Sequence, residues 1–392
     1  MFEIIEKDDG FSTIIKVFGV GGAGGNAIEH MIREGVNGVE FIAANTDAQA
    51  LQSSSAGVRL PLGKSGLGAG AKPEAGQAAA DQHRDDIRAQ LEGAHMAFIT
   101  AGMGGGTGTG AAPVVAEIAR EMGILTVGVV TKPFSFEGSK RMRAAESGIA
   151  EFSKHVDSLI VILNDKLQEV MGDDADVDEC FKAADDVLKN AVGGIAEIIT
   201  FPGLVNVDFE DVRTVMGEMG RAMMGSSTAS GLDRARIAAE QAVASPLLEG
   251  VNLSGARGVL VNITAARGNL KMKEVNEVMN TVKAFAADDA HIIFGAVYDE
   301  TMGDALRVTV VATGLGQLSR QQPLSIVEPM MATGTHDVVG YGGVDYSKLD
   351  VPAVLRGRGQ RASTGTSVTA EALANSGVDR FDIPAFLRKQ AD

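Results

Sequence analysis

Two glycine-rich segments contain residue types that bind phosphate. The first, GVGGAGGNA at residues 19–27, places Gly19, Gly21 and Gly24 in the spacing G-x-G-x-x-G, and an acid, Asp47, follows. An apolar run precedes this segment and a helical pattern follows it. A strand, a glycine turn and a helix present backbone N–H groups to the phosphates of a dinucleotide, while a later acid binds a ribose. On this segment alone, an NAD(P)-dependent oxidoreductase is a reasonable hypothesis.

The second segment, AGMGGGTGTGAAP at residues 101–113, favours a different ligand. Five glycines and two threonines fill residues 104–110, and a helix is predicted from Ala111 onward. This pattern predicts an anion-binding nest at a helix N-terminus, with the Thr107 and Thr109 hydroxyls as further donors. A Walker P-loop requires lysine where Ala111 stands. Since the first segment already accounts for a pyrophosphate, two such nests fit a triphosphate better.

Composition excludes several other kinds of protein. The 392 residues include 35 basic and 51 acidic side chains, and the net charge of −16 would repel nucleic acid. A single cysteine cannot form an intramolecular disulfide, which is typical of a reducing compartment. No apolar run is long enough to span a bilayer, and the six histidines show no metal-binding spacing. We expect a cytoplasmic protein without direct membrane insertion and without a metal site made by protein ligands alone.

The elements around the glycine segments predict an α/β fold. Apolar, β-branched runs alternate with helical patterns, which indicates a Rossmann-like parallel sheet with helices on both faces. Apolar residues then recur every three or four positions from Val177 to Ile199, which predicts one long helix ended by Pro202 and Gly203. Beyond it we expect a smaller α+β region with a helix at 271–286. The predicted strands are 13–20, 39–44, 96–101, 125–130, 158–163, 258–264, 291–298 and 306–312.

The chain changes character after Gly316. Gly, Ser, Thr, Pro and Ala accumulate at residues 317–376 and apolar periodicity disappears, which predicts a flexible, disordered linker. At the extreme end, the apolar residues of FDIPAFLRKQAD would lie on one side of a short helix, a pattern typical of a docking peptide; a frayed terminus is the alternative. The residues that would form this peptide are Asp382, Ile383, Pro384, Phe386 and Leu387.

The motif GGGTGTG at residues 104–110 resembles the signature of the tubulin and FtsZ superfamily. Further segments resemble the FtsZ family, the tubulin-like GTPases of bacterial division, in the same order along the chain. They are GVGGAGGNA, FIAANTDAQAL, GLGAGAKPE, TKPFSFEGSKR, NVDFEDVRTVM and the terminal DIPAFLRKQ. The resemblance implies a GTP-binding domain at 12–175, a central connecting helix at 176–203, an α+β C-terminal domain at 204–316, the linker at 317–376 and a partner-binding peptide at 377–392.

The resemblance also implies a set of nucleotide-binding residues, with GTP or GDP as the ligand and Mg²⁺ and K⁺ as accompanying cations. Asn164, Phe181 and Asp185 would form the guanine pocket, although Phe181 also suits core packing. Glu137 and Arg141 would contact the ribose and phosphates, although residues four apart on a helix also form plain surface ion pairs. Ala23 stands where many relatives have glycine, which requires only a negative φ. The residues implied near the phosphates are Gly22, Ala23, Gly24, Gly25, Asn26, Asn45, Asp47, Ala71, Gly106, Thr107, Gly108 and Thr109.

The segment NVDFEDVRTVM at residues 206–216 carries the implied catalytic residues Asn206, Asp208 and Asp211, at the start of the C-terminal domain. Capping of a new helix is the alternative role for Asp208. In the family this loop enters the nucleotide site of the next subunit, which implies GTP hydrolysis within a head-to-tail homopolymer. A non-hydrolysing tubulin-like scaffold is disfavoured because both acids are present. The resemblance further implies a division ring at midcell beneath the inner membrane, tethered to the membrane and regulated by division proteins that bind the terminal peptide.

Overall fold

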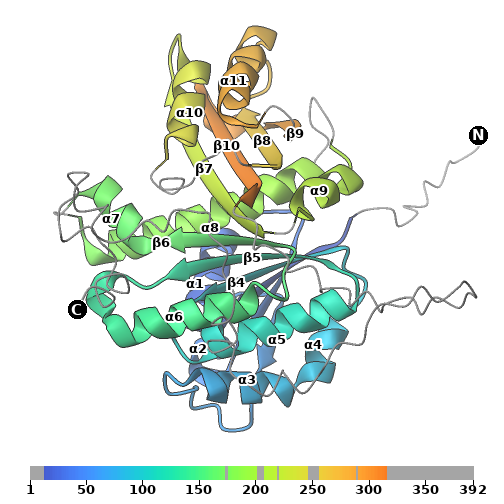
Figure 1. Ribbon diagram of the computed structural model, residues 1–392, viewed down its shortest axis with the longest axis vertical. Coiled ribbons are helices and arrows are strands. Elements are labelled where there is room, and N and C mark those ends of the chain that lie inside the picture. Colours follow the sequence, from blue (N-terminus) through green and yellow to red (C-terminus); the bar gives the residue numbers. More distant parts are fainter. Residues whose placement is uncertain are drawn as a thin grey trace, which may run out of the picture. The chain divides into compact units, whose positions relative to one another are not determined.

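The computed structural model describes residues 13–172, 175–200, 207–218, 220–245, 256–287 and 290–315, all within one unit of the chain. In these ranges ten strands form one sheet in the order β3-β2-β1-β4-β5-β6-β7-β10-β8-β9 (Figure 1). The predicted linker, the predicted terminal peptide and Asn206 lie outside the described residues.

The first six strands pair in parallel in the Rossmann order, which confirms the predicted α/β fold. Both faces of this part are buried, so its strands are apolar on both sides. β4 illustrates this, since Phe98 packs into the core beneath α1 and α8, while Ile99 packs into the core beneath α5. These strands are β1 (Ile15–Val20), β2 (Glu40–Asn45), β3 (Val58–Pro61), β4 (Met96–Gly102), β5 (Leu125–Lys132) and β6 (Ser158–Leu163).

Helices cover both faces of the parallel strands (Figure 1). The helices α1 and α8 pack together on one face, and α3, α4, α5 and α6 lie on the other. The long helix α8 contains 24 residues and begins where the sequence predicts it. These helices are α1 (Gly21–Arg33), α2 (Ala48–Gln52), α3 (Pro73–Asp81), α4 (Arg84–Leu91), α5 (Thr107–Glu121), α6 (Ser139–Phe152), α7 (Asn164–Met171) and α8 (Val177–Thr200).

The later part of the chain extends the same sheet. β7 pairs in parallel with β6 through three residue pairs, Ser158 with Gly220 to Ile160 with Ala222, and then pairs antiparallel with β10. β3 and β7 are not among the predicted strands, so the pairing of β6 with β7, which joins the two parts of the sheet, is not predicted either. The elements are α9 (Phe209–Met216), β7 (Gly220–Ser230), α10 (Arg234–Val243), β8 (Gly258–Ala265), α11 (Met272–Phe285), β9 (His291–Tyr298) and β10 (Ala305–Leu315).

The predicted starts of the two helices after the glycine segments are wrong. α1 begins at Gly21, directly after β1, and α5 begins at Thr107 rather than Ala111, so part of each segment forms helical turns. Glycine has a low helix propensity, but tertiary packing overrides it. A Cβ at Gly24, for example, would lie 2.5 Å from the carbonyl oxygen of Thr100, so the close packing of α1 on the sheet requires glycine there.

No helix in the described ranges combines the length and apolar character that a bilayer crossing requires. The same residues bring no three His, Cys, Asp or Glu side chains together where they could hold a metal ion. Cys180 is 7% exposed within α8 and packs as a small buried residue.

A buried arginine joins α10, α11 and two loops. The Arg234 Nε donates to Glu274 Oε1 at 2.7 Å, Nη1 to the Asp304 carbonyl at 2.8 Å, and Nη2 to the Asn269 carbonyl at 2.5 Å. The side chains of Arg234 and Glu274 are only 9% and 13% exposed. The guanidinium thus satisfies one carboxylate and two carbonyls at once.

We predict that Arg234→Met lowers the free energy of unfolding by about 3 kcal/mol, because it leaves the Glu274 carboxylate buried without its charge partner. Urea unfolding of the free protein measures this effect. The control is Arg236→Met on the same helix, where the arginine is 52% exposed and pairs with Glu240 at 3.1 Å. That variant should unfold like the unsubstituted protein, and equal losses in the two variants would contradict a specific role for the buried pair.

Candidate phosphate, base and acidic sites

The two glycine segments meet at one end of the sheet. They follow β1 and β4, which are neighbouring parallel strands with Val20 paired to Ala101. The carboxyl ends of parallel strands lie at the same edge, so the N-termini of α1 and α5 converge there. A Cβ at Gly21 would lie 2.9 Å from the backbone N of Gly108, which shows how closely the two segments approach. Two helix N-termini with unpaired N–H groups therefore point to one place and favour an anion there.

Glycines in these segments divide into a packed set and an open set. At Gly106 a Cβ would lie 2.9 Å from the backbone N of Lys72, and at Gly108 it would lie 2.6 Å from the Gly102 carbonyl oxygen. These glycines are required for packing. At Gly22, Gly25 and Gly105, by contrast, no atom lies within 4 Å of an added Cβ. These three leave backbone accessible on the open side, where a ligand would lie.

The loop that contains Ala71 packs against the second glycine segment. Ala71 has φ 55, the one positive φ among non-glycine residues in the described ranges. A Cβ at Gly106 would lie 3.2 Å from the Ala71 backbone N. A left-handed alanine is strained and persists only where its surroundings hold it, which occurs most often at binding sites. Ala23, in contrast, has a negative φ within α1, so alanine is compatible with the backbone there.

The two threonines of the second segment differ in their contacts. Thr107 Oγ1 lies 2.6 Å from Thr46 Oγ1, which ties α5 to the residues after β2. Thr109 is only 3% exposed, and its Oγ1 accepts a hydrogen bond from the Gly104 N–H at 2.8 Å. Contact of the Thr107 hydroxyl with a phosphate stays a prediction, whereas the Thr109 hydroxyl is buried and shapes the loop from inside.

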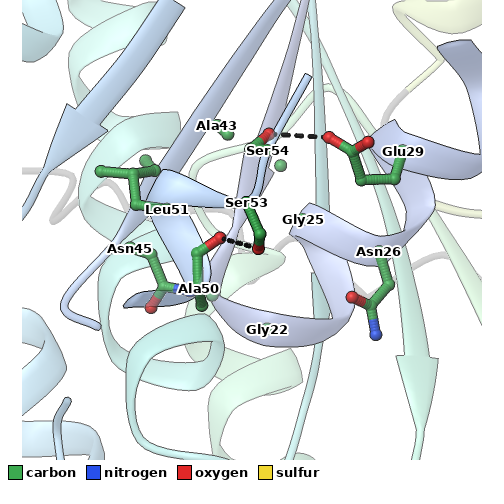
Figure 2. Close-up of a pocket in the computed structure, with 13 residues that line it drawn as sticks. Gly22, Gly25, Asn26, Glu29, Ala43, Asn45, Ala50, Leu51, Ser53 and Ser54 are labelled. Atoms are coloured by element: carbon green, nitrogen blue, oxygen red, sulfur yellow. Dashed lines mark hydrogen bonds between the residues drawn. The ribbon is translucent and has the colours of Figure 1, made fainter. Parts of the chain in front are cut away.

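A pocket lies beside α1, between it and α2 (Figure 2). Asn45 is 9% exposed, and its Oδ1 accepts from the Asp47 N–H at 3.2 Å. Asp47 caps α2 by accepting from the backbone N–H groups of Gln49 and Ala50. The lining residues include Gly21, Gly22, Gly25, Asn26, Glu29, Asn45, Ala50, Leu51, Ser53 and Ser54.

Sequence reasoning misses Glu29 on the wall of this pocket. Its Oε1 accepts from Ser54 Oγ at 2.9 Å (Figure 2) and also from the Ser55 backbone N–H. Burial raises the pKa of Glu29, but these hydrogen bonds outweigh burial and hold it below its ordinary value. The carboxylate therefore stays ionised and fixes the chain after α2. No sequence motif marks Glu29, because its partners are 25 and 26 residues away.

Three aromatic rings outside the lining of this pocket, those of Phe134, Phe136 and Phe181, pack together and are called the aromatic wall below. The Phe181 ring packs edge-on to Phe134 with centroids 5.2 Å apart, and Phe134 stacks on Phe136 at 5.1 Å. Phe134 is buried, whereas Phe181 and Phe136 are 43% and 66% exposed. Phe181 is therefore not a plain core residue, and its exposed ring can stack on a planar ligand.

Asn164 and Asp185 supply polar atoms near this wall. Asn164 is 5% exposed, and its Oδ1 has no hydrogen-bond partner among the described residues. A buried acceptor without a donor is costly, which indicates that a ligand or water donates to it. The pKa of Asp185 is raised to about 6, chiefly by burial and also by the nearby Asp186 carboxylate, while Arg33 opposes the shift. A carboxylate with a raised pKa that faces a site is a candidate ligand group.

Glu137 and Arg141 form the ion pair that their spacing predicts, at 2.6 Å from Glu137 Oε2 to Arg141 Nη1. Glu137 Oε1 also accepts from the Phe134 N–H at 2.9 Å, so the pair is attached to the aromatic wall. The arginine side chain is 53% exposed and remains accessible to a ligand.

The acidic segment begins α9. Asp208 is the N-cap, and its Oδ1 accepts from the Asp211 backbone N–H at 2.8 Å, which confirms the predicted capping role. Both acidic residues are exposed to solvent. The Asp208 carboxylate keeps a second oxygen, and the Asp211 carboxylate is not used by the cap. The cap and a catalytic role are therefore compatible.

α9 lies at the end of the sheet opposite the glycine segments. Its Phe209 ring is edge-on to His95, with centroids 6.1 Å apart, and Arg213 Nη2 donates to the Gly123 carbonyl at 3.2 Å. His95 precedes β4 and Gly123 precedes β5, so α9 packs at the amino ends of these two parallel strands, whereas the second glycine segment follows the carboxyl end of β4. The glycine segments and Asn164 follow the carboxyl ends of parallel strands, whereas Asp208 and Asp211 lie at the opposite end of the sheet.

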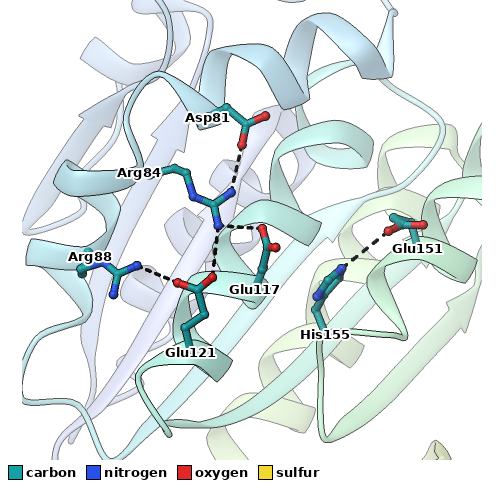
Figure 3. Close-up of polar contacts among 7 residues, drawn as sticks. All are labelled: Asp81, Arg84, Arg88, Glu117, Glu121, Glu151 and His155. Carbon is teal, nitrogen blue, oxygen red and sulfur yellow. Dashed lines mark hydrogen bonds and ion pairs between the residues drawn. The ribbon is translucent and has the colours of Figure 1, made fainter.

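A second charged cluster, on α3, α4 and α5, is structural (Figure 3). Arg84 donates to Asp81 at 3.0 Å and to Glu117 at 2.7 Å, and Arg88 donates to Glu121 at 2.7 Å. The guanidinium of Arg84 has a raised pKa, chiefly because of its hydrogen bond to Glu117. Each of the two arginines and three carboxylates has an ion-pair partner within the cluster, so the cluster presents no unpaired charged group to a ligand.

Family models match two parts of the chain. The model described as "Tubulin/FtsZ family, GTPase domain" matches residues 14–172, and "FtsZ family, C-terminal domain" matches residues 220–316. The chain is 54% identical over 392 residues to the cell division protein FtsZ of Coxiella burnetii, covering 99% of both chains. It is 52% identical over 395 residues to the same protein of Wigglesworthia glossinidia brevipalpis, covering 100% of both.

Solved structures agree with these matches. The empty FtsZ dimer of M. jannaschii superposes with a TM-score of 0.75 at 43% identity, covering 79% of this chain and 90% of that one. A GTPγS-bound protofilament of CetZ2 from Haloferax volcanii has a TM-score of 0.65 at 21% identity, covering 79% and 95%, and supports the fold alone.

Proposed function

Because this chain belongs to the FtsZ family of filament-forming cell-division GTPases, we propose that one GTP binds across its glycine segments and aromatic wall, and that hydrolysis takes place between successive subunits. The observation that carries the proposal is the position of the two sites at opposite ends of the same strands. A subunit that binds GTP at one end and presents Asp208 and Asp211 at the other completes a neighbour's active site. The oxidoreductase hypothesis is not supported by the comparisons.

The phosphates would lie against the backbone N–H groups at the starts of α1 and α5. The open glycines leave room for them, and Thr107, Asn45 and Asn26 add polar side chains. Ala71 and its loop would contact the terminal phosphate. Glu137 and Arg141 would contact the ribose and phosphates. The remaining residues of the proposed phosphate site are Gly22, Ala23, Gly24, Gly25, Asp47, Gly106 and Gly108.

The base would lie between Phe181 and the polar groups of α7 and α8. Guanine presents two donors on one edge, the N1–H and the 2-amino group, and the Asp185 carboxylate can accept from both. Adenine has an acceptor at N1, so the same carboxylate rejects it. The unpaired Asn164 Oδ1 supports a further donor contact in this pocket.

Hydrolysis requires a water oriented toward the γ-phosphate and compensation of the developing charge. We propose that Asp208 and Asp211 of one subunit orient this water in the site of the next, with Asn206 beside them. Mg²⁺ bound to the phosphates would neutralise charge on the leaving oxygens. Asp47 and Asn45 supply the oxygen atoms closest in chemistry to what that ion prefers, and K⁺ would accompany it.

We propose the following division of labour along the chain. Residues 12–175 bind GTP, residues 176–203 connect this domain to the C-terminal domain, and residues 204–316 form that domain and carry the acidic loop. Residues 317–376 form a tether, and residues 377–392 bind membrane-tethering and regulatory division proteins. The family's role in division supports a location at midcell beneath the inner membrane, in the cytoplasm.

The rate of GTP hydrolysis as a function of protein concentration tests the shared active site. We expect no turnover below a threshold and a rate that rises in proportion to protein above it, with Mg²⁺ and K⁺ present. Light scattering should show filaments above the same threshold. A specific rate that does not depend on concentration would mean that each subunit contains a complete site.

The raised pKa of Asp185 leads to a pH prediction. Near pH 6 the free protein holds this carboxyl half protonated, and the protonated form loses an acceptor for guanine. GDP affinity should therefore be highest above about pH 7. Below pH 6 it should fall with a slope that approaches tenfold per pH unit. Fluorescence titration at several pH values measures this. Asp185→Asn is the control, because its remaining pH dependence reports only phosphate titration; identical slopes would contradict the prediction.

A further inference from the structure

His30 is a buried imidazole with both ring nitrogens engaged, and none of the roles above uses it. It is 1% exposed in α1. Its Nε2 lies 2.7 Å from Asp186 Oδ1 in α8, and its Nδ1 lies 2.9 Å from Arg33 Nη2. Since the guanidinium can only donate, Nδ1 accepts and Nε2 carries the proton that is donated to Asp186. A chain of three side chains thus links the surface of α1 to α8.

The two helices that His30 joins carry the two halves of the proposed nucleotide site. α1 begins at the first glycine segment, and Asn26 on the pocket wall is one turn before His30. α8 carries Phe181 and Asp185 four residues apart, on one face of the helix. Asp186 is the next residue after Asp185, so its side chain points about 100° away around the helix axis. A hydrogen bond that holds Asp186 toward α1 therefore fixes the rotation of α8 and with it the direction of Asp185.

We propose that His30 is a positioning residue that aims the Asp185 carboxylate at the guanine edge, so that the protein distinguishes guanine from bases without the 2-amino group. The inference rests on the proposed base pocket. Asp186 is 44% exposed on its own side, so water would compete for it and leave it mobile if the buried imidazole were absent.

A second polar link along the same helices provides a matched control. Lys189 Nζ lies 3.9 Å from Glu34 Oε2, one turn further from the base pocket, and both side chains are partly exposed. Going from His30–Asp186 to Glu34–Lys189 moves about one turn toward the C-terminus along both helices. If any α1–α8 contact sufficed, removing either link would have the same effect on nucleotide selection.

The test compares binding of GDP and IDP, which differ only in the 2-amino group, to the full chain and four variants. The unsubstituted protein should prefer GDP. In His30→Leu the GDP affinity should fall about tenfold while IDP affinity changes little, so the preference narrows. His30→Gln, whose amide can donate to Asp186, should restore part of the preference. Glu34→Gln should keep the full preference, and Asp185→Ala should remove it.

Equal GDP and IDP losses in His30→Leu, or no loss, would overturn the positioning role and leave His30 as packing only. If His30→Leu does not fold, His30→Gln decides the question: a preference as wide as that of the unsubstituted protein supports donation to Asp186, and a preference as narrow as that of Asp185→Ala opposes it. If Asp185→Ala itself keeps the GDP preference, the proposed base pocket is wrong, independently of His30.

Discussion

Replacing Asp211 by alanine is expected to reduce the GTP hydrolysis rate by about 10²–10³-fold while GTP binding stays unchanged, since the loss of one group that acts only in the transition state has an effect of this size. Asp211 is the informative choice because its carboxylate is exposed and its backbone N–H, not its side chain, completes the α9 cap. Asp208→Ala would also remove the cap, at a cost of about 1 kcal/mol. The measurement is phosphate release above the threshold concentration, together with GTP binding and filament formation.

The matched control is Glu210→Ala, between the two acids. Glu210 is exposed and pairs with Arg213 at 3.4 Å on the same helix. The Glu210→Ala variant should hydrolyse GTP at a rate within about twofold of the unsubstituted protein, since exposed ion pairs contribute little. Undiminished turnover in Asp211→Ala would contradict the shared active site, and an equal loss in both variants would indicate disturbance of α9 as a whole.

Asp185→Asn is expected to lower GTP affinity by about 10²-fold and to reverse the choice between GTP and XTP, because two hydrogen bonds to the base are affected. Xanthine presents a carbonyl oxygen where guanine has its amino group. The amide of asparagine can donate to that oxygen, whereas the carboxylate cannot. Competition binding with both nucleotides measures the ratio. Asp178→Asn, an exposed acid in the first turn of the same helix, is the control and should leave the ratio unchanged.

Asp185→Asn should also unfold at a higher temperature than the unsubstituted protein when no nucleotide is present. The pKa of Asp185 is raised by burial, so its ionised form is destabilised in the folded protein. That penalty is absent at low pH, develops as the pH rises past the unfolded pKa and is complete above about 6. Removing the charge therefore stabilises the free protein at neutral pH but not near pH 4. A melting temperature that is unchanged at both pH values would contradict the burial of this carboxylate.

The parallel half of the fold follows from the sequence because its strands are buried on both faces and read as continuous apolar runs. β3 and β7 do not follow in the same way. β3 is only four residues long, and β7 (GRAMMGSSTAS) has little apolar alternation and is identified by its partners β6 and β10. Pairing between residues about 60 positions apart, such as Ser158 and Gly220, leaves no local pattern.

The candidate site shows the same division between local and distant signals. The glycine segments and the acidic segment are contiguous motifs, and the sequence is sufficient to locate them. The packed glycines could not be separated from the open ones, because the difference depends on whether Lys72 or solvent lies against the backbone. Thr109 was expected to face a phosphate, but its hydroxyl faces Gly104. His30 has a partner 156 residues away, so nothing near it in the sequence marks its role.

The opposite placement of the acidic loop and the glycine segments makes the two tips of any filament chemically unlike. The subunit at one tip exposes its glycine segments, with or without bound GTP, and no acidic residues of a neighbour cover them. The subunit at the other tip exposes Asp208 and Asp211 without a neighbour's nucleotide beside them. If the proposed shared active site is correct, the nucleotide at the first tip is not hydrolysed until another subunit adds. Each filament would then have an inherent direction and a terminal GTP that lasts longer than those inside.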